Sequence, residues 1–325
     1  MKTPVAFLIY RRPALTRRVF DEIARARPAR LLVVADGPRS ESERAACEQT
    51  RAVIDGVNWP CDVQTQYAET NLGCRRRVAS GLDWVFSQVE ESIILEDDTV
   101  PHPTFFPFCE ELLARYRDDA RVGHIGGTDC NRGAPRGEGS YYFSRYTSIW
   151  GWATWRRAWQ SYDVDLADWP ANQAAGKHFT WLATRAEAEH FAAVWDDIRA
   201  GVLDTWDAQW FFCRIFQGTL AISPNGNLVT NIGFHAEATH TRDARHPFAE
   251  LPVVPMVFPL RHPREIAADD AADLQRARAE FLRRPDRMRR LMQHLGNKHM
   301  YGKLLRDLPV IGPAWTAWRK RKSGV

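Results

Sequence analysis

Three consecutive carboxylic acids, Glu96, Asp97 and Asp98, directly follow the apolar run Ile93–Leu95. Such a run is typical of a strand buried on both faces of a parallel sheet. Adjacent carboxylates repel one another and are costly to desolvate, so a divalent cation is the simplest group to account for them. Hard oxygen ligands suit Mg²⁺ or Mn²⁺, and such ions commonly bridge to the phosphates of a substrate. A solvated acidic turn without function is the alternative, although the preceding strand favours a metal site.

Polar residues also follow other predicted strands. The carboxyl ends of parallel strands lie along one edge of a sheet, where open α/β sheets bind their ligands. An arginine there would face phosphate, and a carboxylate would accept a hydrogen bond from a base N–H or a ribose hydroxyl. A nucleoside diphosphate with a divalent cation satisfies the whole set, whereas singly these residues fit surface charges or turns. The strands are Pro4–Tyr10, Arg30–Asp36 and Asp62–Ala68, and the residues are Arg11, Arg12, Asp36 and Asn71.

Strand-like and helix-like segments alternate throughout Met1–Gly127. This alternation predicts an α/β fold with a doubly wound, parallel sheet flanked by helices. No Gly-x-Gly-x-x-Gly follows the first strand and the chain has no Walker A sequence, so the usual dinucleotide-binding and ATP-binding interpretations lose support.

After Gly127 the sequence changes character. Thr128–Arg145 is rich in Gly, Asn and Arg, which predicts a loop, and Tyr141–Trp169 is densely aromatic. The later segments follow strand or helix patterns. Helices are expected at Glu187–Ile198 and Asp204–Phe216, short strands at Ala221–Pro224 and Leu228–Phe234, and mostly amphipathic helix from Ala267 onward.

Composition describes an ordinary soluble globular protein. Of the 325 residues, 45% are hydrophobic and 26% are charged. The first ten residues do not resemble a signal peptide, and no apolar run approaches the roughly 20 residues that span a bilayer. The six cysteines are scattered without a Cys-x-x-Cys pair, which favours reduced thiols in a cytoplasmic protein and argues against zinc.

Charge is unevenly distributed along the chain. Residues 276–325 contain 14 Lys and Arg against three acids, whereas residues 1–275 contain 30 basic and 37 acidic residues. A basic helix that contains tryptophan can lie on an anionic membrane surface, which would suit a lipid-linked acceptor. A helix packed on the catalytic domain with a solvated basic face is the equal alternative. We expect no nucleic-acid binding, because the body is acidic and has no recognisable module.

Several of these motifs together resemble the GT-A glycosyltransferases, and within them bacterial relatives of the N-acetylglucosaminyltransferase I group. The motifs are Asp36-Gly37, Asn71-Leu72-Gly73 and Leu95-Glu96-Asp97-Asp98, with Phe105 and Phe106 beyond them. The resemblance covers roughly residues 4–240, and its most specific part is the Glu-Asp-Asp in its strand context. It implies a GT-A (Rossmann-like), mostly parallel sheet and inverting transfer from a UDP-linked sugar with Mn²⁺ or Mg²⁺.

The resemblance also implies roles for individual residues. Asp98 corresponds to the direct metal ligand of the family, while Glu96 and Asp97 contact the nucleotide. Arg12, in Tyr-Arg-Arg-Pro, matches the arginine after the first strand, and Asp36 matches the acid that reads the uracil. The nucleotide-sugar contacts expected in this half are therefore Arg12, Asp36, Asn71, Glu96 and Asp97.

A candidate general base comes later in the chain. Trp206-Asp207-Ala208-Gln209-Trp210 resembles the helix start that carries the family's base. An inverting transfer needs one carboxylate near the acceptor hydroxyl, and Asp207 is the residue we expect there. The spacing departs from the family pattern, so Asp204 remains a lesser candidate. An acid at a helix start is also explained by capping alone.

Two further groups are candidates for the same site. Ser148–Trp155 resembles the loop that covers the donor sugar in the family, and from it Trp150, Gly151 and Trp152 are expected to contact the sugar nucleotide. Trp155 and Trp159, four residues apart, are expected in the core instead. Some GT-A enzymes add a late histidine to the metal, which makes His240 a candidate ligand, although a structural histidine is the more common case.

The chain is therefore predicted to contain a GT-A-like domain at residues 1–262 and a basic helical tail at 263–325. Within the domain, residues 1–127 would bind the nucleotide and residues 128–262 the acceptor. We expect a hexosyl- or N-acetylhexosaminyltransferase that acts on a glycan or lipid-linked glycan in envelope polysaccharide or lipopolysaccharide synthesis. It would be cytoplasmic, with peripheral contact to the inner face of the plasma membrane as an added possibility.

Two alternatives to this function remain. A sugar-1-phosphate nucleotidyltransferase would share much of the sheet and the metal-binding acids, but it usually has a glycine-rich loop after the first strand. The corresponding segment here, Tyr10-Arg11-Arg12-Pro13, has no glycine. A non-catalytic carbohydrate-binding protein would use the tryptophans, and it would not need the three acids or a metal.

Overall fold

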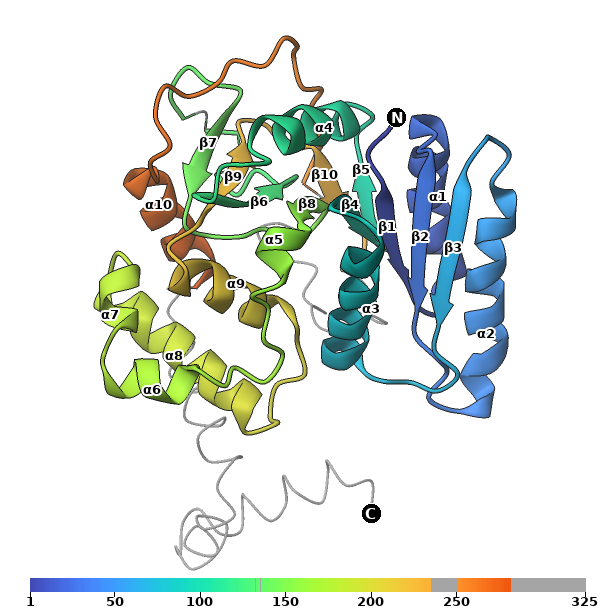
Figure 1. Ribbon diagram of the computed structural model, residues 1–325, viewed down its shortest axis with the longest axis horizontal. Helices are drawn as coiled ribbons and strands as arrows, with labels where there is room; N and C mark the ends of the chain where they lie inside the picture. The colour runs from blue at the N-terminus through green and yellow to red at the C-terminus, as the bar shows by residue number, and fades with distance from the viewer. Residues whose placement is uncertain (132, 135, 235–250, 282–325) are drawn as a thin grey trace, which may run out of the picture. The chain divides into compact units, whose positions relative to one another are not determined.

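A sheet of eight strands runs through the protein in a computed structural model that describes residues 1–131, 133–134, 136–234 and 251–281 (Figure 1). The strands are β1 (Val5–Ile9), β2 (Arg30–Ala35), β3 (Asp62–Tyr67), β4 (Glu91–Glu96), β6 (Val122–Gly126), β7 (Tyr141–Ser144), β8 (Trp152–Trp155) and β9 (Leu220–Pro224). Their order across the sheet is β3-β2-β1-β4-β8-β6-β9-β7. Only β7 and β8 run against the other six, so the predicted α/β fold with a mostly parallel sheet is confirmed.

The first half of the sheet is covered by helices on both faces. Because side chains alternate along a strand, Phe7 of β1 packs into a core with α1 and α4, while Leu8 packs into a second core with α3. Both faces of β1 are therefore buried, which is why its sequence is apolar throughout. The helices of this half are α1 (Pro13–Ala26), α2 (Glu41–Ala52), a 3-10 turn (Val53–Gly56), α3 (Cys74–Gln88) and α4 (Phe105–Arg115).

The strands β7 and β8 correct the expectation that Thr128–Arg145 is a loop and that the tryptophans after it form a loop over the donor. β8 lies between β4 and β6 and is antiparallel to both. All four residues of β7 and all four of β8 are buried, so neither strand shows the polar and apolar alternation that marks a half-exposed strand. Trp155 and Trp159 are buried, as expected.

A second, two-stranded sheet lies immediately after the acid cluster. In it β5 (Thr99–Pro101) pairs in antiparallel fashion with β10 (Val229–Asn231). The Ile232 amide also donates to the carbonyl of Asp98, at 2.8 Å. The loop that carries Asp98 is therefore joined to a segment more than a hundred residues later in the chain.

The helices of the second half are held together largely by aromatic side chains. In this part Trp169, Trp195 and Phe212 pack edge to face with centroid distances of 4.8–6.0 Å. At the start of α8, Thr184 caps the helix, because its hydroxyl accepts from the Glu187 amide at 3.2 Å and donates to the Glu187 carboxylate at 2.6 Å. The helices are α5 (Arg156–Trp159), α6 (Trp169–Ala174), α7 (His178–Trp181), α8 (Arg185–Arg199) and α9 (Asp207–Phe216).

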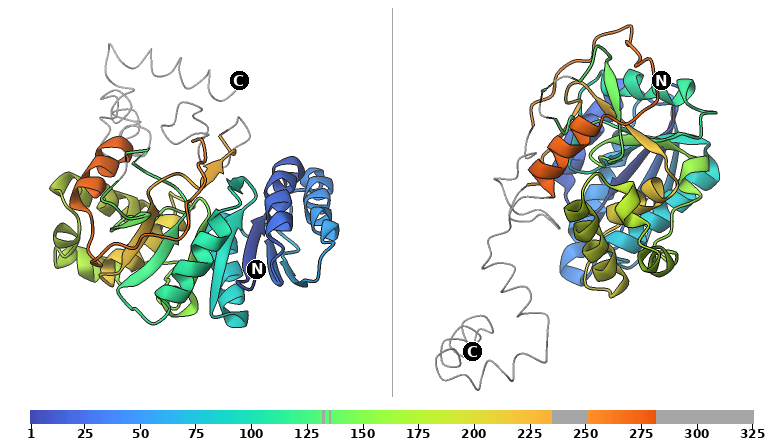
Figure 2. Two further views of the ribbon diagram at one scale, coloured as in Figure 1. Left: turned by 90° about the horizontal axis from the view of Figure 1, so that it is seen from above. Right: turned by 90° about the vertical axis from the view of Figure 1, so that its left-hand side faces the viewer.

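The last described helix, α10 (Asp270–Glu280), lies beside β7 at the end of the sheet away from β3 (Figures 1 and 2). Its buried Asp273 accepts hydrogen bonds from the Ser144 hydroxyl, at 2.5 Å, and from the Arg145 amide, at 3.1 Å. Residues 1–281 form one compact unit. Of the basic tail predicted at 263–325, residues 282–325 lie outside the described residues, and the predicted boundaries at 127 and 262 stay predictions. None of the described helices is long and apolar enough to cross a membrane.

Candidate active site

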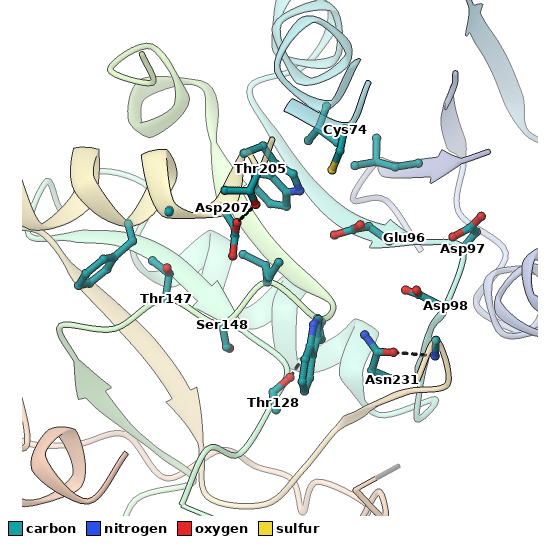
Figure 3. Close-up of a pocket in the computed structure, with 18 of the residues that line it drawn as sticks. Cys74, Glu96, Asp97, Asp98, Thr128, Thr147, Ser148, Thr205, Asp207 and Asn231 are labelled. Carbon is teal, nitrogen blue, oxygen red and sulfur yellow. Dashed lines mark hydrogen bonds between the residues drawn. The ribbon is translucent and has the colours of Figure 1, made fainter. Parts of the chain in front are cut away.

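A cavity of about 570 Å³ lies at the carboxyl-terminal ends of β1, β2 and β4. The elements opposite these strand ends are the segment before β8, α8, the start of α9 and the end of α10. Figure 3 shows Asp207 and Thr205 on one side of the cavity and the acids that follow β4 on the other. Of the residues predicted for the site, the cavity is lined by Arg12, Asp36, Asn71, Glu96, Asp97, Asp98, Trp150 and Asp207.

Arg12 lies beside the acids rather than free to meet a phosphate. Its Nη2 contacts Asp97 and lies 2.8 Å from Asp98 Oδ2, and Nε donates to Asp97 Oδ2 at 3.3 Å. The amide of Tyr10 also donates to Asp97, which is 3% exposed. The sheet edge therefore holds Asp97 through three contacts, whereas Asp98 has one cation beside it.

The three acids are incompletely neutralised by their surroundings. Burial opposes the charge of Arg12, but Asp97 and Asp98 outweigh it and raise the pKa of the guanidinium. Burial, followed by repulsion from Asp98 and Asp97, raises the pKa of Glu96 well above its usual value. Burial also raises the pKa of Asp98, although Arg12 opposes this. A second positive charge at this place would relieve the repulsion.

The residues present fit a divalent cation that is bound together with a phosphate. Glu96 Oε1 is buried and accepts no hydrogen bond from the residues that the structure describes. Mg²⁺ is commonly held by one or two carboxylates, with substrate phosphates and water as its other ligands. Within the described part of the chain, no group of three or more His, Cys, Asp or Glu side chains is arranged to hold a metal. Glu96 and Asp98 therefore suit an incomplete site, and His240 lies outside the described residues.

Asp36 and Asn71 connect two loops at the edge of the cavity that lies beyond β2 and β3. Asp36 Oδ1 accepts from the amides of Gly37, at 2.8 Å, and Leu72, at 2.9 Å, while Oδ2 accepts from Asn71 Nδ2 at 2.9 Å. Gly37 is required by close approach, because a Cβ there would overlap the backbone of Thr70. Burial raises the pKa of Asp36 in spite of these hydrogen bonds.

The two acids considered for the base have different surroundings. Asp207 lines the cavity at the first residue of α9, and its Oδ1 accepts a hydrogen bond from the Thr205 hydroxyl. Asp204 is not a lining residue, and its Oδ1 accepts from the Arg75 amide in the first turn of α3, at 3.1 Å. Asp204 therefore acts as a cap for a helix distant in sequence, whereas Asp207 is the first residue of α9 and not its N-cap, which is Trp206.

The three residues that were expected to contact the donor sugar, Trp150, Gly151 and Trp152, have different positions relative to the cavity. Trp150 lines the cavity, whereas Gly151 and Trp152 do not. Trp152 is fully buried and stacks on Trp206 at 5.6 Å, so its expected contact with the sugar nucleotide is replaced by a role in the core. Gly151 has φ +64°, and a Cβ there would lie 2.7 Å from Val229.

Two buried side chains that the sequence did not single out hold the segment before β8. His124 Nδ1 accepts from Trp210 Nε1 at 3.1 Å, so its Nε2 carries the proton and donates to the Ser148 carbonyl at 3.0 Å. Arg276 of α10 donates to the carbonyl of Thr147 at 2.9 Å. Neither contact has a sequence signal, because both join segments distant in the chain.

Comparison with known proteins shows no family. No protein-family model and no curated protein matches the chain. It is similar to 4-diphosphocytidyl-2C-methyl-D-erythritol synthase from Anaerococcus prevotii, with 8% identity and a TM-score of 0.35 over 68% of this chain and 87% of that one. It is also similar to mouse xyloside xylosyltransferase 1 in its apo form, with 11% identity and a TM-score of 0.34 over 66% of this chain and 81% of that one.

A third similar structure is UDP-glucose pyrophosphorylase complexed with UDP-glucose, with 12% identity and a TM-score of 0.25 over 44% of this chain and 62% of that one. Because all three TM-scores lie below 0.5, these likenesses identify neither a family nor an activity for this chain. The functional conclusion depends on the cavity and the residues that line it.

Proposed function

We propose that this protein is a metal-dependent, inverting glycosyltransferase that moves a sugar from a UDP-sugar to a hydroxyl of a glycan or lipid-linked glycan. The observation that carries the proposal is the single cavity shared by the acids after β4 and Asp207 at the start of α9. The first group suits a diphosphate with its cation, and the second suits the deprotonation of an acceptor.

In the proposed reaction the acceptor oxygen forms a bond to C1 of the donor sugar while the bond from C1 to the diphosphate oxygen breaks. UDP leaves with the electron pair of that bond, and the proton of the acceptor hydroxyl goes to Asp207. The Thr205 hydroxyl donates to Oδ1 of this carboxylate, which orients it and leaves Oδ2 for the proton.

The nucleotide end would use groups that are already ordered. The Asp36 carboxylate accepts three hydrogen bonds, from Gly37, Asn71 and Leu72, and a carboxylate offers about four acceptor positions. The remaining position would accept the N–H of a uracil. Asp98, the ligand expected from the resemblance, would hold Mg²⁺ or Mn²⁺ together with Glu96, which the resemblance instead assigned to the nucleotide. The cation would neutralise charge on the departing diphosphate.

Thermal unfolding with UDP-, GDP- and dTDP-sugars, each with and without Mn²⁺, tests the proposal. A ligand at 100 times its dissociation constant stabilises the protein by about 2.7 kcal/mol. We expect the largest rise in melting temperature with a UDP-sugar and Mn²⁺ together. Glycan binding that needs neither nucleotide nor metal would instead favour a carbohydrate-binding protein. Pyrophosphate release from a nucleoside triphosphate and a sugar 1-phosphate would favour a nucleotidyltransferase.

A further inference from the structure

Beyond Asp207, the cavity is bounded by four aromatic side chains that pack on one another. We call Tyr146, Phe191, Phe211 and Phe281 the aromatic wall. The ring of Phe191 lies 4.5 Å from that of Phe211 and 4.9 Å from that of Phe281, and Tyr146 lies 5.3–5.4 Å from Phe211 and Phe281. All four line the cavity, and they come from the segment before β8, from α8 and α9, and from the residue after α10.

The aromatic wall continues directly from the proposed catalytic position. Asp207 and Phe211 are four residues apart on α9, so they lie on the same face of that helix, and both line the cavity. Figure 3 shows Asp207 between Thr147, which follows Tyr146 of the wall, and Glu96. A donor bound at the acids would therefore have the wall on the far side of Asp207, where an acceptor has to lie.

The charged groups near the wall compensate each other. Arg276 Nε lies 2.9 Å from Glu280 Oε2, and the guanidinium of Arg276 lies over the rings of Tyr146 and Phe281 at 5.4 and 5.9 Å. Leu203 and Val194 add aliphatic side chains to the same cavity. His190 packs on Phe191 and Phe281, at 5.2 and 5.8 Å, and lines the cavity as well. The rings of the wall and the two aliphatic side chains present apolar faces, which favour an apolar group.

We propose that the aromatic wall binds the hydrocarbon chain of a lipid-linked acceptor, with the chain attached close to the sugar that carries the reactive hydroxyl. The inference rests on the proposed function, because it takes Asp207 as the position of that hydroxyl. It assigns the lipid to the catalytic cavity itself. The inference does not require the membrane contact that was one of two expectations for the basic tail at 263–325.

Binding of n-alkyl β-D-glucopyranosides tests the wall without knowledge of the natural acceptor. Hexyl, heptyl and octyl glucosides, each below its micelle concentration, are titrated by calorimetry in the presence of UDP and Mn²⁺. Each methylene that the wall buries is expected to tighten binding about fourfold, which corresponds to about 0.8 kcal/mol. Phenyl β-D-glucopyranoside is the comparison ligand, and we expect it to bind more weakly than the octyl compound.

The matched variants are Val194→Glu and Ala193→Glu. Val194 lines the cavity three residues after Phe191 on the same face of α8, whereas its neighbour Ala193 is exposed and does not line it. A carboxylate beside a buried chain has to be desolvated, so Val194→Glu should remove the chain-length dependence. Ala193→Glu should retain the fourfold step in affinity per methylene. If Val194→Glu does not fold, the wild-type chain-length series still decides the question.

The outcomes separate this inference from the proposed function. Equal affinity for all alkyl chains, several binding sites per protein, or identical behaviour of the two variants would overturn the assignment of the wall. If the phenyl compound binds more tightly than the octyl compound, the wall binds an aromatic group and not a hydrocarbon chain. If UDP binds with Mn²⁺ and chain length has no effect, only the inference fails. If chain length matters and UDP does not bind, the proposed function fails and the wall remains a hydrocarbon site.

Discussion

The two sides of the cavity are organised by different physical means. On the sheet side, Asp36 and Asp97 are each held by three polar contacts. On the helical side, Asp207 has one hydrogen-bond partner among the described residues, Thr205, and the surrounding order comes from packed aromatic rings. In the proposed function, hydrogen bonds would preorganise the groups that recognise the nucleotide, whereas packing would fix the shape of the surface that meets the less polar acceptor.

The largest effect on the helical side is expected from removing α10. A chain that ends at residue 262 lacks α10, and with it the buried Asp273 and the Arg276 that supports the Thr147 carbonyl. Breaking such a buried polar network costs about 3–5 kcal/mol, a large part of the stability of a typical domain. We expect this chain to lose cooperative thermal unfolding.

A chain that ends at residue 281 is the matched control, since it keeps the whole compact unit. It should unfold cooperatively and retain UDP binding in Mn²⁺. Equal melting temperatures for the two truncated chains would show that α10 contributes nothing to the helical side.

Asp207→Asn should lower glycosyl transfer by on the order of 10²–10⁴-fold while UDP-sugar binding stays nearly unchanged, because the amide cannot take a proton. Asp204→Asn is the control. Asn also caps helices well, so this change at the start of α3 should cost only a few tenths of a kcal/mol. Steady-state rates with the identified acceptor give the comparison, and a wild-type rate for Asp207→Asn would place the base elsewhere.

His124→Phe should destabilise the fold by about 2–4 kcal/mol, because it leaves Trp210 Nε1 and the Ser148 carbonyl without their partner in a buried place. In the wild type the His124 ring stacks on Trp152 with a centroid distance of 5.2 Å, and a phenyl ring can stack in the same way. The loss of stability therefore reports the two hydrogen bonds. His178→Phe is the control: this buried histidine also packs on a tryptophan, but its Nδ1 has no hydrogen-bond partner within the described part of the chain. Urea unfolding of both variants should give a clearly larger loss for the first.

The same histidine predicts a pH dependence. Burial, together with the nearby Arg214, lowers the pKa of His124 from 6.5 to about 3, despite an opposing hydrogen bond to Ser148. Between these values the unfolded chain binds a proton that the folded protein does not, so stability falls as the pH is lowered from 6.5. The variant His124→Phe lacks this contribution.

The difference in unfolding free energy between wild type and His124→Phe should therefore shrink on acidification, by up to about 1.4 kcal/mol per pH unit. Urea unfolding at pH 7, 6, 5 and 4 measures it. If the difference in unfolding free energy stays constant across this pH range, His124 has the same pKa in the folded and the unfolded protein, which would contradict the prediction.

The sheet side could be predicted from the sequence because its signals are local. Apolar runs such as Ile93–Leu95 mark strands, and polar residues at their ends mark the ligand edge. Parallel pairing places the ends of these strands along one edge, and Arg12, Asp36, Asn71 and the acids at the end of β4 line one cavity there. Which ligand these residues bind stays a prediction.

The helical side could not be predicted in the same detail because its order comes from long-range contacts. Trp152 and Trp150 have similar sequence surroundings, yet one is core and the other lines the cavity. β8 inserts between β4 and β6 against the direction of both, and nothing in four buried residues indicates the partner strands. Asp204 caps a helix that begins 130 residues earlier, at Cys74, a contact invisible to local pattern.

The central claim is that the cavity binds UDP through a divalent cation at Glu96 and Asp98. Calorimetric titration of UDP into the wild-type protein in Mn²⁺, into the same protein with a chelator, and into Asp98→Asn in Mn²⁺ tests it most directly. We predict saturable binding to one site in the first titration and an affinity lower by about 100-fold or more in the other two, which corresponds to about 2.7 kcal/mol. The same UDP affinity in all three titrations would contradict the account.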